Sequence, residues 1–205
     1  MRKLPRRIFL GVLVSGLVIV MAIVLTLFRN VYLHHFPLRF SWLSVIVGVV
    51  GFLLWIGIAA LGVERWVAET FAPWMIPPGR PSFNPFAQIP DGTTRTIFMA
   101  VRFTLLAALV PIAEELFVRG RLTRWMEDVD WPTVSLTLLS MVALATPTVY
   151  GMATHVEVLA ALVWFSLVTW LMVRTGNFWD CVVAHMTTNL LLGIYVVIFS
   201  QWQLW

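Results

Sequence analysis

The residues best suited to chemistry are two adjacent glutamates, Glu114 and Glu115, near the end of a long apolar segment. Arg119 follows Glu115 by four residues, so these two side chains share a helix face and can form an ion pair. Glu114 points about 100° away from that face and is left without this cation. A charged side chain inside an apolar span costs roughly 2.5 to 3.5 kcal/mol, so such residues are expected to have a task and a partner.

A carboxylate held among apolar side chains without a cation is a stronger base than one in water, and it can take a proton from a water molecule. Glu114 is therefore a candidate general base. Pro111 adds to this arrangement, because its ring removes a helical hydrogen bond and frees the Ala107 carbonyl, which predicts a kink or a water pocket. The alternative is a helix that leaves the membrane here, with its charged residues already among lipid headgroups.

A second polar pair, His185 and Asn189, lies one helical turn apart on one face of another apolar run. Two hydrogen-bond donors at this depth suit the oxyanion of a tetrahedral intermediate, which needs donors where negative charge develops. The alternative is a polar pair that only holds helices together, which contributes about 1 kcal/mol. With the glutamates, the pair favours hydrolysis by an activated water.

Membrane helices must position these side chains. The chain has 205 residues, of which 60% are hydrophobic and 12% charged, and its mean hydropathy is +0.88, which leaves too little polar surface for a water-soluble protein. We expect an all-α, polytopic membrane helix bundle with about six transmembrane helices. The length of each is close to the roughly 20 residues that a helix needs to cross a bilayer. The predicted spans are Ile8 to Phe28, Trp42 to Val63, Thr96 to Leu116, Val134 to Tyr150, Val158 to Val173 and Val182 to Ser200.

The remaining sequence is read as part of one membrane domain, residues 1–205. Arg2, Lys3, Arg6 and Arg7 precede the first span and predict an uncleaved anchor with a cytoplasmic N-terminus. No basic stripe follows, so we expect the lipid bilayer as a partner and no nucleic acid. A multi-pass protein of the bacterial inner or cell membrane is the expected localisation.

Two connecting segments have their own signatures. Residues 64–76 are expected to form an interfacial helix, because Trp66, Val67, Phe71 and Trp74 roughly share a face. Residues 77–90 contain five prolines and predict an exposed connection: Pro77, Pro78, Pro81, Pro85 and Pro90. This connection could gate or dock a substrate, or it could be a simple spacer.

The polar motifs resemble those of a known family. Glu114-Glu115-x-x-x-Arg119 is similar to the first signature of the CPBP family, the CAAX-protease and bacteriocin-processing group also called Abi, and His185-x-x-x-Asn189 is similar to its last. Residues 174–179, Arg-Thr-Gly-Asn-Phe-Trp, resemble the family's lead-in to that last motif. The resemblance covers a catalytic core at residues 106–193 and implies a glutamate-dependent intramembrane endopeptidase.

In that family the first glutamate, here Glu114, would activate the attacking water. The resemblance also implies that Arg119 holds Glu115 in place and that His185 and Asn189 stabilise the oxyanion. No cofactor is implied. The substrate would be a membrane-embedded or lipid-anchored peptide or protein, cleaved in C-terminal processing or sorting.

The family's middle signature, Phe-x-x-x-His, is matched only in part. His155 supplies the histidine, but Gly151 stands at the phenylalanine position, with Tyr150 one residue earlier. A straight helix that begins near Trp131 would place His155 at the membrane face opposite Glu114. Either Pro147 and Gly151 break this helix and return His155 to the site, which we favour, or a residue such as Thr146 takes its place.

Three other interpretations remain. Glu114, His155 and His185 could be the three protein ligands of a catalytic zinc. Cys181 could act as a nucleophile beside His185, although a buried packing role is expected. The protein could also be a membrane binding or immunity protein of the same family without catalysis.

Overall fold

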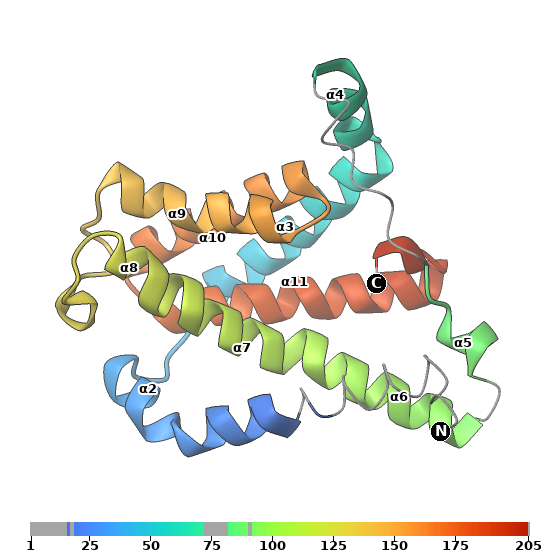
Figure 1. The fold of residues 1–205 in the computed structure, drawn as a ribbon, viewed down its shortest axis with the longest axis horizontal. Helices are drawn as coiled ribbons and strands as arrows, with labels where there is room; N and C mark the ends of the chain where they lie inside the picture. Colours follow the sequence, from blue (N-terminus) through green and yellow to red (C-terminus); the bar gives the residue numbers. More distant parts are fainter. Residues whose placement is uncertain (1–15, 17–18, 72–81, 90–91, 205) are drawn as a thin grey trace, which may run out of the picture.

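The chain is described by a computed structural model over residues 16, 19–71, 82–89 and 92–204, and all regular elements of this part are helical (Figure 1). The prediction of an all-α membrane helix bundle is confirmed. Residues 19–27 are helical and lead to the labelled helices. These are α2 (Arg29–His35), α3 (Trp42–Ala60), α4 (Val63–Phe71), α5 (Pro85–Gln88), α6 (Gly92–Thr104), α7 (Val110–Glu115), α8 (Thr123–Trp125), α9 (Met141–Thr154), α10 (Val158–Thr175) and α11 (Phe178–Phe199).

Four stretches of the described chain are long and apolar enough to cross a membrane. Each overlaps one predicted span, although the one that carries the glutamates is longer than predicted. Of the predicted first span, Ile8 to Phe28, residues 19–27 are helical, and residues 8–15 and 17–18 lie outside the described residues, as do the basic residues before the span. The four stretches are Trp42–Ala60, Gly92–Trp125, Val158–Thr175 and Phe178–Phe199.

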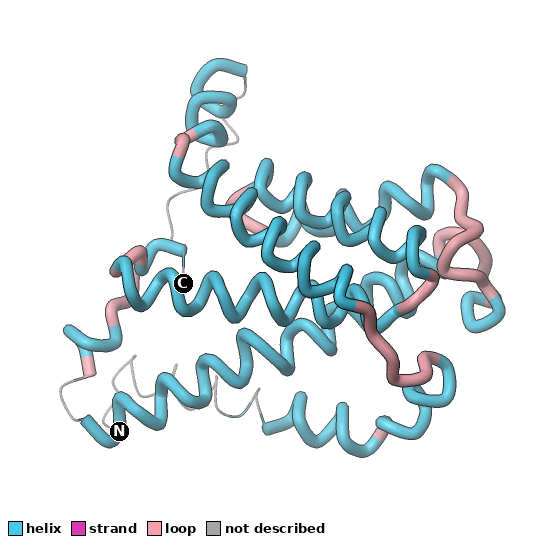
Figure 2. Tube along the Cα trace, turned by 180° about the vertical axis from the view of Figure 1, so that it is seen from behind, coloured by secondary structure: helices cyan, strands magenta, loops and turns pink. Residues whose placement is uncertain are grey.

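The predicted span Val134 to Tyr150 is wrong in its bounds. Helix α9 begins at Met141 and ends at Thr154, and its 14 residues are about 21 Å long at the α-helical rise, which is short for a hydrocarbon core of about 30 Å. Hydroxyl side chains explain the late start. The Ser135 hydroxyl accepts the Thr137 N–H (3.1 Å), and the Ser140 hydroxyl caps α9 at the Ala143 N–H (3.3 Å). Such bonds compete with helix formation and favour a loop followed by an N-cap. Figure 2 shows this loop between α8 and α9 at one end of the bundle.

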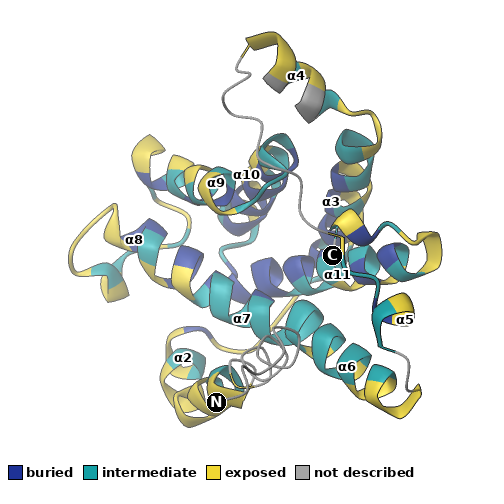
Figure 3. Ribbon diagram, turned by 45° about the vertical axis from the view of Figure 1, so that its right-hand side comes forward, coloured by how far each residue is buried: buried dark blue, intermediate teal, exposed yellow. Residues whose placement is uncertain are grey.

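Helix α11 lies between α3 and the long helix that carries the glutamates, and α10 lies between α3 and α9 (Figure 1). Buried residues are concentrated on α10 and α11 (Figure 3). Glycine permits the close approach of α3. A Cβ at Gly48 would lie 2.7 Å from the Ala184 carbonyl oxygen, and one at Gly51 would lie 2.8 Å from the Trp164 ring. Small residues at such crossings let helix backbones approach in a membrane.

The lead-in to α11 holds the segment before α3. Asn177 donates from its side-chain amide to the Arg39 carbonyl (2.8 Å), and the Trp179 indole donates to the Phe36 carbonyl (2.8 Å). Asp180 accepts the backbone N–H of Ser41 at 2.6 Å. These bonds fix α11 relative to α3 at the same end of the bundle.

A helix, α4, lies where the interfacial helix is predicted, and it projects away from the bundle (Figure 1). Trp66 and Phe71 are exposed on it, with their ring centroids 6.1 Å apart. Of the five prolines that follow, Pro85 begins α5. Residues 72–81 and 90–91, which include Trp74 and the other four prolines, lie outside the described residues.

Candidate active site

The helix that carries the glutamates is irregular on both sides of them. Residues Leu105–Leu109 and Leu116–Leu122 are π-helical, and α7 lies between these two segments. In the first segment the Val110 N–H bonds to Leu105, five residues back. The next such bond would join residue 111 to the Leu106 carbonyl, but Pro111 has no N–H to donate. Insertions of this kind are frequent at functional sites.

The carbonyl that Pro111 frees is accordingly that of Leu106, and Asn189 of α11 donates its side-chain amide to it at 3.0 Å. The Ala107 carbonyl was predicted instead, because the prediction assumed the four-residue hydrogen-bond spacing of an α-helix. Asn189 therefore joins α11 to the irregular turn before the glutamates. One of its two amide N–H groups is used in this bond.

Glu115 and Arg119 form the predicted ion pair, and both side chains are fully buried. Arg119 Nη1 lies 2.8 Å and 2.6 Å from the two Glu115 oxygens, and Nη2 donates to the Phe165 carbonyl at 3.3 Å. The guanidinium also lies 5.8 Å from the Trp164 ring centroid and 5.3 Å from that of Phe165. The charge of Glu115 is thus compensated inside the bundle, and this carboxylate is not exposed to water.

His185 connects the two glutamates. Its Nδ1 lies 2.9 Å from Glu115 Oε1, and its Nε2 lies 3.8 Å from Glu114 Oε2. Because the ion-paired Glu115 carboxylate accepts hydrogen bonds, Nδ1 carries a proton and donates it. The Nε2 atom then faces Glu114, and it can donate a hydrogen bond only when the imidazole is doubly protonated.

The His185 ring is held against Trp164, with their centroids 4.6 Å apart in an edge-to-face arrangement. The Trp164 indole donates to the Thr188 hydroxyl at 3.1 Å, and Thr188 donates to the Gly48 carbonyl at 2.8 Å. These contacts join α3, α10 and α11 behind the imidazole. The aromatic and hydroxyl side chains of this support escaped the sequence analysis, since an apolar helix offers no local signal that singles out Trp164 or Thr188.

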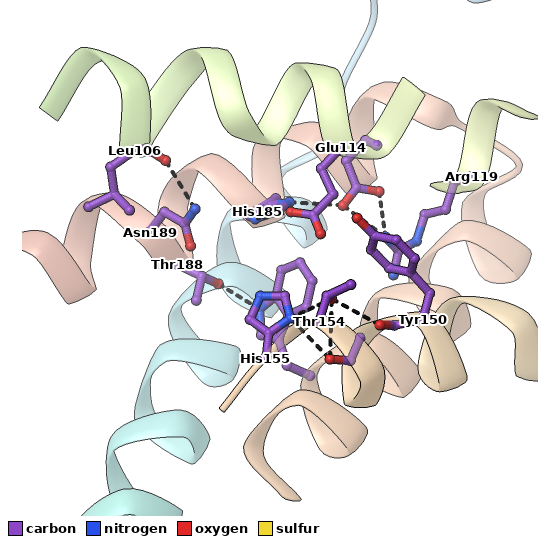
Figure 4. Close-up of polar contacts among 12 residues, drawn as sticks. Leu106, Glu114, Arg119, Tyr150, Thr154, His155, His185, Thr188 and Asn189 are labelled. Atoms are coloured by element: carbon purple, nitrogen blue, oxygen red, sulfur yellow. Dashed lines mark hydrogen bonds and ion pairs between the residues drawn. The ribbon is translucent and has the colours of Figure 1, made fainter. Parts of the chain in front are cut away.

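Glu114 is the more accessible of the two carboxylates, with 13% of its side chain exposed against 0% for Glu115. The close-up in Figure 4 shows it between His185 and Tyr150. The Tyr150 hydroxyl lies within hydrogen-bonding reach of the Glu114 carboxylate. Tyr150 was not predicted as a site residue, although its position beside the partly matched middle motif was a usable signal.

His155 lies near this carboxylate and follows the end of α9. Its Nδ1 is 3.1 Å from the Gly151 carbonyl, so Nδ1 carries a proton, and in the neutral ring Nε2 is left as a hydrogen-bond acceptor. Its ring packs 5.7 Å from Trp55 and 5.4 Å from Phe165, measured between centroids. Burial lowers the pKa of His155, and the negative charge of Glu114 opposes this shift.

The route by which His155 reaches the site differs from the predicted one. Helix α9 is not broken at Pro147 or Gly151. It starts at Met141 rather than near Trp131 and is therefore shorter than predicted, so its end does not extend to the opposite membrane face. The alternative residue, Thr146, donates its hydroxyl to the Val142 carbonyl of its own helix at 2.9 Å.

Gly151 has a structural reason to replace the family's phenylalanine. A Cβ at this position would overlap the ring of Phe165, which comes from α10. Phe165 packs there against His155, Trp164 and the Arg119 guanidinium. An aromatic ring is therefore present beside the site, supplied by another helix.

The two rival interpretations concern a cysteine nucleophile and a zinc site. Cys181 is fully buried between α10 and α11, with its sulfur 3.9 Å from the carbonyls of Val168 and Asn177. No group of three or more His, Cys, Asp or Glu side chains that could hold a metal ion is found there. The zinc interpretation therefore gains no support from the positions of Glu114, His155 and His185.

Comparison with known proteins agrees with the motifs. Residues 96–191 match the family model described as "Type II CAAX prenyl endopeptidase Rce1-like", and this range includes all six predicted site residues. No curated protein and no solved structure matches the chain. The predicted resemblance to the CAAX-protease group is confirmed. Over residues 96–191, just under half of its length, the chain is similar to this family of CAAX proteases.

Proposed function

We propose that this protein is an intramembrane endopeptidase in which Glu114 activates water to cleave a membrane-anchored protein or lipid-anchored peptide. The observation that carries the proposal is the unequal environment of the two glutamates. Glu115 is fully buried and bound by Arg119 and His185, whereas Glu114 keeps an accessible edge beside two histidines and a tyrosine. One carboxylate is suited to hold the site together and the other to exchange protons.

The proposed reaction uses these positions. A water molecule binds to Glu114, with His155 Nε2 as a second acceptor for its protons. Glu114 takes one proton, the water oxygen bonds to the scissile carbonyl carbon, and the carbonyl electron pair moves to oxygen. The C–N bond then breaks, and Glu114 returns the proton to the leaving nitrogen.

The oxyanion formed in this step needs donors. His185 is suited to this role in its doubly protonated form, because Nδ1 is fixed on Glu115 and an Nε2 proton would point toward the reacting carbonyl. Asn189 can contribute its second amide N–H while the first stays on the Leu106 carbonyl. No step requires a metal ion.

The apolar setting and the family match support a proposal for the substrate class. The matched family is described as a type II CAAX prenyl endopeptidase, and for this chain we infer a membrane-anchored substrate cut in C-terminal processing or sorting. The bacterial inner or cell membrane is the proposed location. Prenylated peptides and sorting tails are the first two classes to assay.

The experiment compares cells that produce the wild-type chain, Glu114→Gln or Glu69→Gln. Glu69 is an exposed control on α4. Mass spectrometry of the ends of membrane polypeptides should find at least one polypeptide that is cut with the wild type and with Glu69→Gln but accumulates uncut with Glu114→Gln. Equal cleavage in all three cells would contradict catalysis and favour a binding or immunity role.

A further inference from the structure

Tyr150 lies beside Glu114 and is not one of the predicted site residues. Tyr150 is on α9, and its ring lies between Phe117 and Phe165, with centroid distances of 5.8 Å and 6.1 Å. Phe117 comes from the π-helical segment directly after the glutamates, and Phe165 comes from α10. Two aromatic contacts from different helices thus fix the ring, and Figure 4 shows the phenol directed toward Glu114.

The hydroxyl of Tyr150 can act only as a donor to an ionised carboxylate, because the carboxylate has no proton to give. Glu114 and Thr154 lie within its hydrogen-bonding reach, and of these two only Glu114 is a carboxylate. A hydrogen bond to a charged acceptor is directional and about twice as strong as a neutral one. It would hold one carboxylate oxygen of Glu114 and leave the other for water. Among the described residues no arginine forms an ion pair with Glu114.

The same tyrosine lines an open apolar groove of about 620 Å³. One wall contains Leu122 and Met126, and the other contains Val142, Ala145 and Val149 of α9. Val142 and Val149 are each 63% exposed. In a bilayer such exposed apolar side chains face lipid, so the groove opens toward the phase in which a membrane-anchored substrate lies.

We infer that Tyr150 is a positioning residue that orients the Glu114 carboxylate at the inner end of this groove, and that the groove binds the apolar part of the substrate next to the scissile bond. The inference rests on the proposed function. The substrate is the expected occupant because the groove is continuous with the proposed active site: Tyr150 both lines the groove and contacts Glu114.

The test uses the full chain in phosphatidylcholine vesicles and, as probe, a synthetic peptide spanning the cleavage site found by the cell comparison above. Tyr150→Phe keeps the ring between Phe117 and Phe165 and removes only the hydroxyl. Tyr195→Phe is the matched control, since Tyr195 lies on α11 against Phe52 and Phe199. We expect kcat to fall about 10- to 150-fold for Tyr150→Phe, the value of a hydrogen bond to a charged group, with KM and thermal stability like those of the control.

A kcat of Tyr150→Phe equal to that of Tyr195→Phe would overturn the role of Tyr150. A lower kcat of Tyr150→Phe that is accounted for by a lower unfolding temperature would overturn it as well. Ala145→Trp tests the groove: filling it should raise KM and leave kcat unchanged, and an unchanged KM would overturn the groove as the binding site. The parent proposal is tested separately by Glu114→Gln on the same peptide. If Glu114→Gln is inactive while Tyr150→Phe is fully active, only the present inference fails; if Glu114→Gln cleaves normally, both fail.

Discussion

Replacing Arg119 with methionine should unfold the site more than any surface change, because it removes the cation from a fully buried pair. Arg119 gives two contacts of 2.8 Å and 2.6 Å to Glu115 and a third hydrogen bond of 3.3 Å to the Phe165 carbonyl. After the replacement, Glu115 would keep its charge in an apolar interior with His185 as donor. Leaving one partner of a buried pair uncompensated costs about 3 to 5 kcal/mol. We expect the free energy of unfolding to fall by that amount.

The assay is reversible denaturant unfolding in mixed micelles, followed by tryptophan fluorescence. Arg121→Met is the matched control, two residues along the same helix and exposed, and it should change the unfolding free energy by less than about 0.5 kcal/mol. In the double variant Glu115→Leu with Arg119→Met, both charges are gone, so the loss should be smaller than for Arg119→Met alone. Equal stability of Arg119→Met and Arg121→Met would refute the reasoning.

Three further predictions concern other parts of the bundle. Gly151→Ala should lower the free energy of unfolding by about 1 to 3 kcal/mol through overlap with the Phe165 ring; Phe165→Leu in the same chain should restore part of this, and wild-type stability of Gly151→Ala would contradict it. The Ser140 N–H lowers the pKa of the Glu127 carboxyl in the folded state, so the bond stabilises the fold above the unfolded-state pKa and is lost as the pH falls through the lowered one. Glu127→Gln should therefore lower the unfolding temperature at neutral pH and match the wild type in acid; a difference that persists in acid would argue against this bond. Cys181→Ala should cleave substrate at the wild-type rate, and loss of cleavage in a folded protein would restore the cysteine as a nucleophile.

Local rules made part of this structure predictable. The spacing of Glu115 and Arg119 gave their ion pair, since residues four apart meet on a helix. Apolar length placed α3 and α10 within a few residues of their observed ends. The polar pair on α11 marked the second wall of the site. Its hydrogen bond to Glu115 could not be predicted from helix periodicity, because His185 is 70 positions further along the chain.

Other features depended on context that the sequence does not display. The π-helical register changed which carbonyl Pro111 frees, and so gave Asn189 a partner in Leu106. Hydroxyl side chains delayed the start of α9, and this brought His155 back to Glu114 without a broken helix. Tyr150 was visible beside a partly matched motif, but its direction depends on rings from two other helices.

We assign catalysis to Glu114 and a structural role to Glu115. This assignment is tested most directly by measuring cleavage and stability together for Glu114→Gln. The amide keeps the shape of the side chain but cannot take a proton from water. We expect the cleavage rate of the identified peptide to fall about 100- to 10,000-fold, the usual contribution of a general base, while the free energy of unfolding stays at the wild-type value. Cleavage at the wild-type rate by a folded Glu114→Gln protein would contradict the account.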